Sequence, residues 1–355
     1  MLFTNVLPLL LVAVTAAPDR IVRRQSPAAS QKASKVEQLQ PVLRKTAQKI
    51  RITYGPYKLK GLGSNATLGN AKSLDKDGTS YAHALGADFP HNVTIIDTNT
   101  YITNSAGAKL SMESGNVFNH HHLFFDAAHT PNPFLGCGPD AKPLKSIYPK
   151  SNFMASATGD IQMRYTSTDG KFNGGFYIGA NDSLSFMGDF INYNKEALDM
   201  YTVSEIEYVP GKIEGMHTGS SQLLTMDMCG RGLRGATEAA PKDGKMFTKT
   251  GDALTILRDG WFVHSRGTLS PGGVDIVMKI NDKLICRSNA IYGGPTNSSV
   301  TGMSACPEEL AVKKGDKLSV AATFDLEKHK PRQGPYPTGL GGPLALWVPM
   351  FAEAN

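Results

Sequence analysis

Short apolar runs bounded by turn residues make up most of this chain. Glycine, proline, serine and asparagine recur about every ten residues, and the runs between them are rich in β-branched and aromatic side chains. Several runs, such as "VSEIEYV" and "KLSVAATFD", alternate apolar and polar positions, which is typical of strands with one buried face. In "INDKLIC" the pair Asn281-Asp282 separates two such runs and predicts a hairpin.

Many short strands without helices between them predict an all-β fold, built as two tandem antiparallel jelly-roll or β-sandwich domains. The stretch "GRGLRGATEAAPKDGK" is rich in glycine and charge and poor in apolar residues, so it predicts a linker. We therefore expect a first domain over residues 51–230, a linker over 231–250 and a second domain over 251–355.

The N-terminal segment predicts secretion. In "MLFTNVLPLLLVAVTAAPDR" an apolar run is followed by small residues and then by charge, as in a signal peptide that is too short to span a bilayer. We assign the signal to residues 1–17 and a pro-segment, N-terminal helix or linker to residues 18–50. Arg23-Arg24 is either a processing site or two solvated arginines. No comparable apolar run follows, so we expect no membrane span.

Sequons and cysteines agree with a secreted or lumenal glycoprotein. The sequons begin at Asn65, Asn92, Asn181 and Asn297. Four cysteines in an oxidising compartment are expected to form two disulfides, with three connectivities to choose from. Cys286 and Cys306 are close in sequence and flank a turn-rich segment, which favours their pairing and leaves Cys137 for Cys229. The formal charge of +6 forms no basic stripe interleaved with aromatics, so we expect no nucleic-acid partner.

Three consecutive histidines, His120 to His122, interrupt the apolar segment "NVFNHHHLFF". Neighbours on a regular strand point to opposite faces, so two of them could bind one metal only where the backbone bends or bulges. Imidazole suits copper and zinc. The alternative is a solvent-exposed polar edge, against which the surrounding phenylalanines and Leu123 indicate burial.

The segment "NHHHLFF" resembles the histidine-pair strand of the copper monooxygenases that hydroxylate peptidylglycine or dopamine. "GGFYIGANDSLSFMGDFINYN", "TVSEIEYVPG" and "LTILRDGWFVHSRGTLSPGGVDIVMKINDKLICRSNAIYG" resemble later segments of that family, in the same order. "KLICRSNAIYG", "TGMSACP" and "KKGDKLSVAATFD" are similar to the stress-up-regulated nodulin family, distant relatives of these enzymes. The resemblance covers residues 55–352 and implies two jelly rolls and two copper sites.

For the first copper, the resemblance implies His120 and His121 as ligands. The family places a third histidine in the segment that reads "VSEIEYV" here, where this chain has Glu205 and Glu207. His217, in "EGMHTGSS", is the alternative third ligand.

The second copper site departs from the family pattern. Its "HxH" is represented by His264-Ser265-Arg266, and an arginine stays cationic and cannot ligate a metal. Met350 stands too late in the last strand to match the family's methionine ligand. We therefore expect His264 to be a packed or hydrogen-bonded histidine in a degenerate site.

Three hypotheses for function follow. The first is a diverged copper-dependent oxidase or oxygenase that acts on a small metabolite. The second is a non-catalytic extracellular module that binds copper or is associated with stress or the cell wall. The third is metal-free acid–base chemistry in an inter-domain cleft, for which the candidates are Glu205, Glu207, Asp126, His129 and Arg266.

Overall fold

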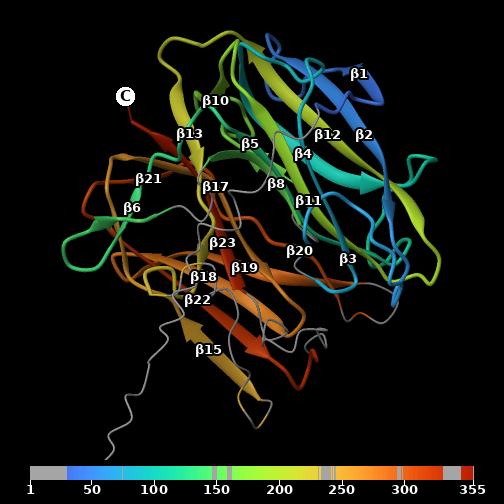
Figure 1. Cartoon of the computed structure of the whole chain (residues 1–355). Coiled ribbons are helices and arrows are strands. Elements are labelled where there is room, and N and C mark those ends of the chain that lie inside the picture. Colours follow the sequence, from blue (N-terminus) through green and yellow to red (C-terminus); the bar gives the residue numbers. More distant parts are fainter. Residues whose placement is uncertain are drawn as a thin grey trace, which may run out of the picture.

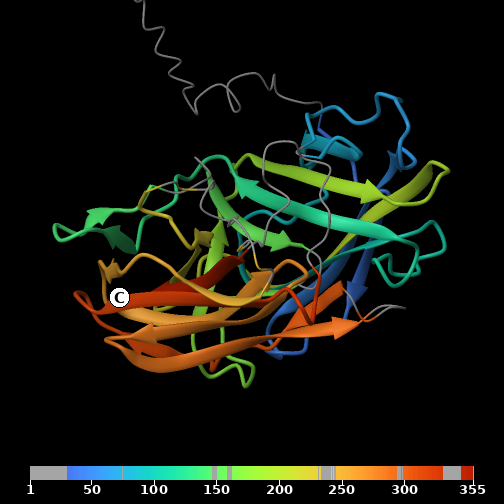
Figure 2. The same cartoon turned by 90° about the horizontal axis from the view of Figure 1, so that it is seen from below.

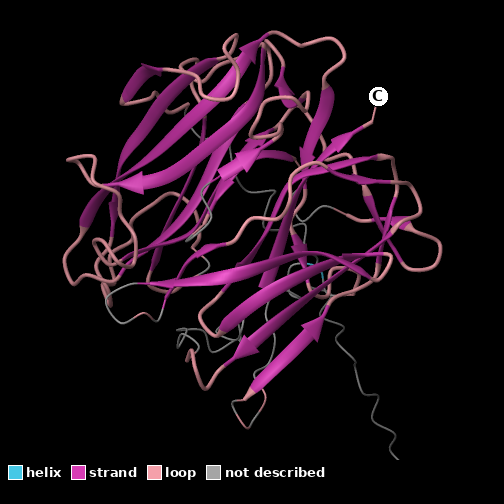
Figure 3. Ribbon diagram, turned by 180° about the vertical axis from the view of Figure 1, so that it is seen from behind, coloured by secondary structure: helices cyan, strands magenta, loops and turns pink. Residues whose placement is uncertain are grey.

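The computed structural model describes residues 30–73, 75–145, 150–157, 162–230, 232, 241, 243, 245–293, 297, 299–330 and 345–354. Its regular elements are strands, with no α-helix among these residues (Figure 3). The predicted all-β class is confirmed, whereas the structure does not confirm a tandem jelly-roll arrangement. The predicted signal peptide and Arg23-Arg24 lie outside the described residues, as does most of the predicted linker.

Three sheets contain the strands of the described residues (Figure 1). The longest has eleven strands, in the order β1 (Lys35–Leu39), β2 (Gln48–Leu59), β12 (Leu198–Pro210), β4 (Val93–Thr103), β10 (Gly174–Ile178), β13 (His217–Ser221), β23 (Ala345–Glu353), β17 (Gly260–Leu269) and β21 (Leu310–Val312), with β9 (Gln162–Arg164) on β4 and β14 (Leu224–Thr225) on β23. A four-stranded sheet has the order β3 (Gly78–Ala84), β11 (Leu184–Asn192), β5 (Val117–Asp126) and β8 (Ser151–Ser156). An eight-stranded sheet has the order β20 (Ser299–Met303), β19 (Lys283–Gly293), β18 (Gly273–Ile280), β22 (Lys317–Asp325), β16 (Leu254–Ile256), β6 (Leu135–Cys137) and β7 (Lys142–Pro143), with β15 (Met246–Thr250) on β22.

The long sheet is shared by two sandwiches, which Figure 2 shows from below. One core lies between the four-stranded sheet and β2, β4, β10 and β12, and includes Tyr54, Phe124 and Phe186. A second core lies between the eight-stranded sheet and strands β17 and β23, and includes Phe262 and Phe324. Alternating apolar positions produce both cores because successive side chains of a strand point to opposite faces.

The sheets also cross the predicted domain boundary. We call residues 51–230 the first half and residues 251–355 the second half. The C-terminal strand β23 lies between β13 of the first half and β17 of the second half. Conversely, the short strand β6 of the first half pairs with β16 of the second half, in the eight-stranded sheet. The two halves therefore exchange strands, and each sandwich contains residues from both.

The described part of residues 18–50 does not form the predicted N-terminal helix. Residues 35–39 form β1, which pairs antiparallel with β2 from Lys35 opposite Thr53 to Leu39 opposite Lys49. Helix propensity is a weak preference that tertiary context overrides, and the N–H and C=O groups along the edge of β2 need partners.

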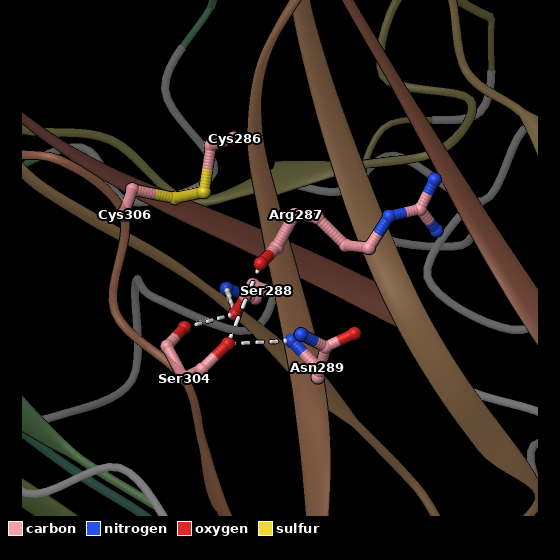
Figure 4. The surroundings of a disulfide bond; sticks show 7 residues. Cys286, Arg287, Ser288, Asn289, Ser304 and Cys306 are labelled. Atoms are coloured by element: carbon pink, nitrogen blue, oxygen red, sulfur yellow. Dashed lines mark hydrogen bonds between the residues drawn. A yellow bond between two sulfur atoms is a disulfide. The ribbon is translucent and has the colours of Figure 1, made fainter.

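Two disulfides pair the cysteines as the sequence analysis favoured: Cys137 with Cys229, and Cys286 with Cys306. Figure 4 shows that the second bond lies beside Ser304, whose carbonyl accepts a hydrogen bond from Ser288 Oγ at 2.6 Å. Both disulfides are consistent with a secreted protein. In the part of the chain that the structure describes, no helix is long and apolar enough to cross a membrane.

We predict unequal stabilities for the two disulfide-free variants. Cys137 and Cys229 are 92 residues apart, and Cys286 and Cys306 are 20 apart. In the chain-entropy model the longer loop contributes about 4–5 kcal/mol and the shorter about 3 kcal/mol. Urea unfolding of Cys137→Ser/Cys229→Ser and of Cys286→Ser/Cys306→Ser measures the difference. A larger loss from the second variant would contradict the loop-length account.

Candidate metal-binding site

The pairing of β5 with β11 is irregular at the triple histidine. Asp189 of β11 is opposite His121, but the next residue, Phe190, is opposite Asn119. His120 is therefore an extra residue on β5, as in a β-bulge, in which two residues of one strand oppose one residue of the other. This is the backbone irregularity that two neighbouring histidines need in order to reach one metal.

The bulge brings His120 and His121 together. Their Nδ1 atoms lie 2.9 Å apart, and the ring centroids are 5.1 Å apart. His122 points into the protein core instead, where its ring neighbours Phe186 and its Nδ1 lies 3.2 Å from the Oδ1 of Asn119. Asn119 and His122 thus contact each other on the interior side, while the histidine pair is only partly buried.

The electrostatics of this strand keep the imidazoles of His121 and His122 neutral. Burial, followed by the neighbouring His120 and His122, lowers the pKa of His121 to about 3. Burial alone lowers the pKa of His122 to about 3. A neutral imidazole has a lone pair that a metal can use, and copper and zinc both accept this ligand.

The distance between the two Nδ1 atoms is close to the distance between two ligand atoms of one metal ion. Two metal–nitrogen bonds of about 2.0 Å at a tetrahedral angle hold their nitrogens about 3.3 Å apart. The Nδ1 atoms of His120 and His121 are already at 2.9 Å, so a movement of a few tenths of an ångström suffices. The donor set of two imidazoles suits copper better than a hard cation such as calcium.

The structure does not bring Glu205 to this pair. Glu205 belongs to the long sheet, where its Oε1 accepts hydrogen bonds from Arg51 Nη2 at 2.8 Å and from the Tyr101 hydroxyl at 3.1 Å. Burial raises the pKa of this carboxyl, but the bonds from Arg51 and Tyr101 outweigh burial and leave it lowered. Glu205 therefore remains an anion in an ion pair.

Glu207 and His217 are likewise engaged elsewhere. The Glu207 carboxylate accepts backbone hydrogen bonds from Val42, Leu43 and Arg44 at 2.7–3.1 Å, which hold the loop between β1 and β2. His217 Nδ1 donates to the Glu353 carbonyl at 3.0 Å, and aromatic rings pack against its imidazole. These contacts give both residues a structural role that requires neither a metal nor acid–base chemistry.

One other group of ligand-type side chains lies at the far end of β5. Among the described residues, only Asp126, His129 and Asp182 bring three ligand atoms of His, Cys, Asp or Glu within 4.8 Å of one another. His129 Nδ1 lies 2.6 Å from Asp126 Oδ2 and 3.5 Å from Asp182 Oδ2. This set of two carboxylates and one imidazole suits zinc or harder cations. Sequence reasoning missed Asp182 because 56 residues separate it from Asp126.

The predicted degenerate site lies on β17, at the junction of the two halves. His264 is 5% exposed, and neither of its ring nitrogens has a hydrogen-bond partner. Arg266 donates a hydrogen bond to the Gln162 carbonyl. Burial lowers the pKa of Arg266 to about 10, with Asp97 opposing the shift, so Arg266 is a cation at neutral pH.

Met350 stands too late in its strand to match the family's methionine ligand, and the structure pairs it with His264 across β17 and β23. A bulge at Val263 shifts the register and produces this pairing. Imidazole with a thioether is a donor set for reduced copper. The permanent charge of Arg266, two residues beyond His264, opposes a second cation here.

Comparison with known proteins gives a distant relationship. No family model matches the chain, so the resemblance to the nodulin family is not confirmed. A probable copper-dependent oxygenase of Cochliobolus lunatus is 22% identical over 230 residues, which are 63% of this chain and 69% of that protein. This similarity supports a distant relationship to an oxygenase.

Two solved structures also overlap with much of the chain. They are a peptide-N(4)-(N-acetyl-β-D-glucosaminyl)asparagine amidase, with a TM-score of 0.38, and PNGase F of Flavobacterium meningosepticum, with a TM-score of 0.39. The identities are 8% and 9%, and each overlap covers 86% of this chain and 96% of the other. These TM-scores are too low to assign a shared fold.

His264 predicts a loss of stability in acid. Burial, with Arg164 adding to its effect and Glu308 opposing it, lowers the pKa of His264 to about 4. Above the ordinary histidine pKa of about 6.5 the ring is neutral in both the folded and the unfolded state. Below that pH the unfolded chain takes up a proton that the folded one refuses, so stability falls until the pH reaches about 4.

Urea unfolding of wild type and His264→Leu between about pH 7 and pH 4.5 tests this. The wild type should lose up to about 1.4 kcal/mol per pH unit more than the variant. His83, His121 and His122 keep their own shifts in both proteins. Equal slopes in the two proteins would refute the prediction for His264.

Proposed function

We propose that this chain is a secreted copper-dependent oxidoreductase of the oxygenase type, which binds one copper ion through His120 and His121. The observation that carries the proposal is the bulge in β5, which brings the two Nδ1 atoms to 2.9 Å. The distant similarity to a probable copper-dependent oxygenase supports the choice of copper over zinc.

Copper bound here would supply one-electron chemistry and the activation of oxygen. The chain's own residues would fix its position. The pair provides two imidazole nitrogens, and Asn119 with His122 anchors the strand from the interior side. Since both ligand histidines are only partly buried, the remaining coordination positions are open to exogenous ligands or a small-molecule substrate.

One copper per chain is the proposed stoichiometry. Arg266 takes the place of a second-site ligand and is a cation at neutral pH. It belongs to a charged cluster at the junction of the halves, where Arg164 Nε lies 2.9 Å from Asp97 Oδ1. Such a cluster joins the two halves, and its cationic side chains repel a second metal ion.

A non-catalytic copper-binding module is the second candidate. It is favoured by the absence, among the described residues, of a third His, Cys, Asp or Glu atom within 4.8 Å of both ligand nitrogens. The two candidates differ in turnover alone. An oxidoreductase consumes oxygen when supplied with ascorbate and substrate, whereas a binding module does not.

Glycosylation forms part of the proposal. Asn65, Asn181 and Asn297 are exposed, as acceptor sites must be. Asn92 is exposed as well and has a positive φ of 50°, and its Oδ1 accepts a hydrogen bond from the Tyr177 hydroxyl at 3.0 Å. Its amide nitrogen, to which a glycan would be attached, is not engaged by that bond.

We predict that copper binding depends on the histidine pair and on neither Glu205 nor His217. Protein secreted from a eukaryotic host without an affinity tag should bind about one copper per chain, the number of ions that one bulge can hold. His120→Ala and His121→Ala should weaken binding by more than the roughly 10–100-fold effect of losing an outer-shell partner.

The matched controls are Glu205→Gln and His217→Gln, which should keep copper because both residues lie in the long sheet with other partners. Oxygen uptake with ascorbate is then measured for the copper-loaded proteins. Undiminished copper binding in the His120→Ala/His121→Ala double variant would refute the site. Copper binding without turnover of any screened substrate would favour the second candidate, the non-catalytic copper-binding module.

A further inference from the structure

A buried tyrosine and a buried histidine form a close polar contact in the first core. The Tyr57 hydroxyl lies 2.6 Å from His83 Nε2. Tyr57 is 3% exposed and His83 is 6% exposed, and the two rings are stacked with an interplanar angle of 17°. A phenol so close to an imidazole, and so far from water, has a defined partner for its proton.

The hydrogen bonds of His83 define the direction of proton donation. His83 Nδ1 lies 3.1 Å from the Ala84 carbonyl, which can only accept, so Nδ1 carries the hydrogen. In a neutral ring Nε2 is then the acceptor, and the Tyr57 hydroxyl donates to it. Burial lowers the pKa of His83, which keeps the ring neutral. The second neighbour of the phenol, Gln31 Oε1, is farther away at 3.2 Å.

Aromatic rings connect this pair to the histidine strand. Phe186 of β11 stacks on His83, with a centroid distance of 4.8 Å, and on Tyr57, with a centroid distance of 5.8 Å. The ring centroid of Phe186 also lies 6.2 Å from that of His122. His122 follows His121 directly in the chain. The ring contacts thus lead from the pair to His122, and the backbone connects His122 to the proposed ligand His121.

The same pair also has a contact toward the surface. The ring of Tyr81 lies 4.9 Å from that of Tyr57. Tyr81 is partly exposed, and its hydroxyl donates to the Lys58 carbonyl at 2.8 Å. An electron that enters at Tyr81 therefore has a route of ring contacts inward to Tyr57.

We propose that Tyr57 and His83 form a redox-active pair that relays single electrons between the surface at Tyr81 and the strand that carries His120 and His121. In the oxidising step Tyr57 loses one electron to a one-electron oxidant, and its hydroxyl proton moves to His83 Nε2. The products are a neutral tyrosyl radical and an imidazolium. An electron from an external reductant of the ascorbate class restores the phenol, and the proton returns to the oxygen.

The redox activity of the pair is independent of copper, whereas the delivery of electrons to a metal rests on the proposed function. The first experiment therefore uses the metal-free protein. Photogenerated ruthenium(III) tris-bipyridine is the oxidant, persulfate is the terminal acceptor, and freeze-quench electron paramagnetic resonance detects tyrosyl radicals. The variants are Tyr57→Phe, His83→Gln and Tyr81→Phe.

The matched control is Tyr165→Phe. Tyr165 is 1% exposed, but its hydroxyl donates to the Phe153 carbonyl at 3.0 Å, which cannot take up the proton. We expect a long-lived radical in the wild type and in the control, and its loss in Tyr57→Phe. His83→Gln should shorten its lifetime while leaving the phenol in place, and Tyr81→Phe should slow its formation. Thermal unfolding verifies that each variant folds.

A radical signal of unchanged size and lifetime in both Tyr57→Phe and His83→Gln would overturn the proposal. A second experiment loads the protein with copper(I) and follows its oxidation to copper(II) by the same oxidant. We expect Tyr57→Phe to slow this oxidation at unchanged copper content. An unchanged rate would overturn the relay to the metal. Failure to bind copper would refute the proposed function, and the metal-free experiment would still decide the redox activity of Tyr57.

Discussion

The site depends on one irregular backbone pairing, the bulge that makes His120 an extra residue opposite β11. In a regular strand His120 and His122 would share a face and His121 would point away from both. The bulge instead places His120 and His121 together, and turns Asn119 and His122 toward the interior. Two faces of one strand thus acquire different chemistry, with a ligand pair on one and an anchored, buried histidine on the other.

The wider fold holds this strand in place. β5 lies between β11 and β8, and its pairing with β8 begins at His122, directly after the bulge. This pairing fixes the register of the strand next to the histidine pair. The long sheet under it continues through β13 and β23 into the second half. The charged cluster of Arg164, Asp97 and Arg266 then lies between the halves, so the junction is a structural contact.

Sequence reasoning predicted the all-β fold class, because alternation is a local signal. The family resemblance singled out His120 and His121, whose Nδ1 atoms lie 2.9 Å apart in the structure. Sequence reasoning also favoured the disulfide pairing that the structure shows, since Cys286 and Cys306 are close in the chain. The partners of distant residues were harder to predict. Glu205 and His217 qualify as ligands by type, but long-range strand order gives them other partners. The same holds for Met350, which meets His264 only because of a bulge at Val263.

The N-terminal segment shows the same limit. The sequence analysis allowed a helix within residues 18–50, but the edge of β2 supplies partners for an extended backbone over residues 35–39. The Tyr57–His83 contact was equally invisible in the sequence because β2 and β3 meet there only through the packing of the first core. Patterns along the chain therefore predict which elements form, whereas strand order and bulges decide which side chains meet.

The central claim is that the β5 bulge creates a two-imidazole copper site. X-ray absorption spectroscopy of the copper-loaded protein tests it most directly, because outer-shell scattering counts the imidazoles on the metal. The account predicts two imidazoles in the wild type and one in each of the variants His120→Ala and His121→Ala. Two imidazoles remaining on copper in either variant would show that the metal is bound elsewhere and would contradict the account.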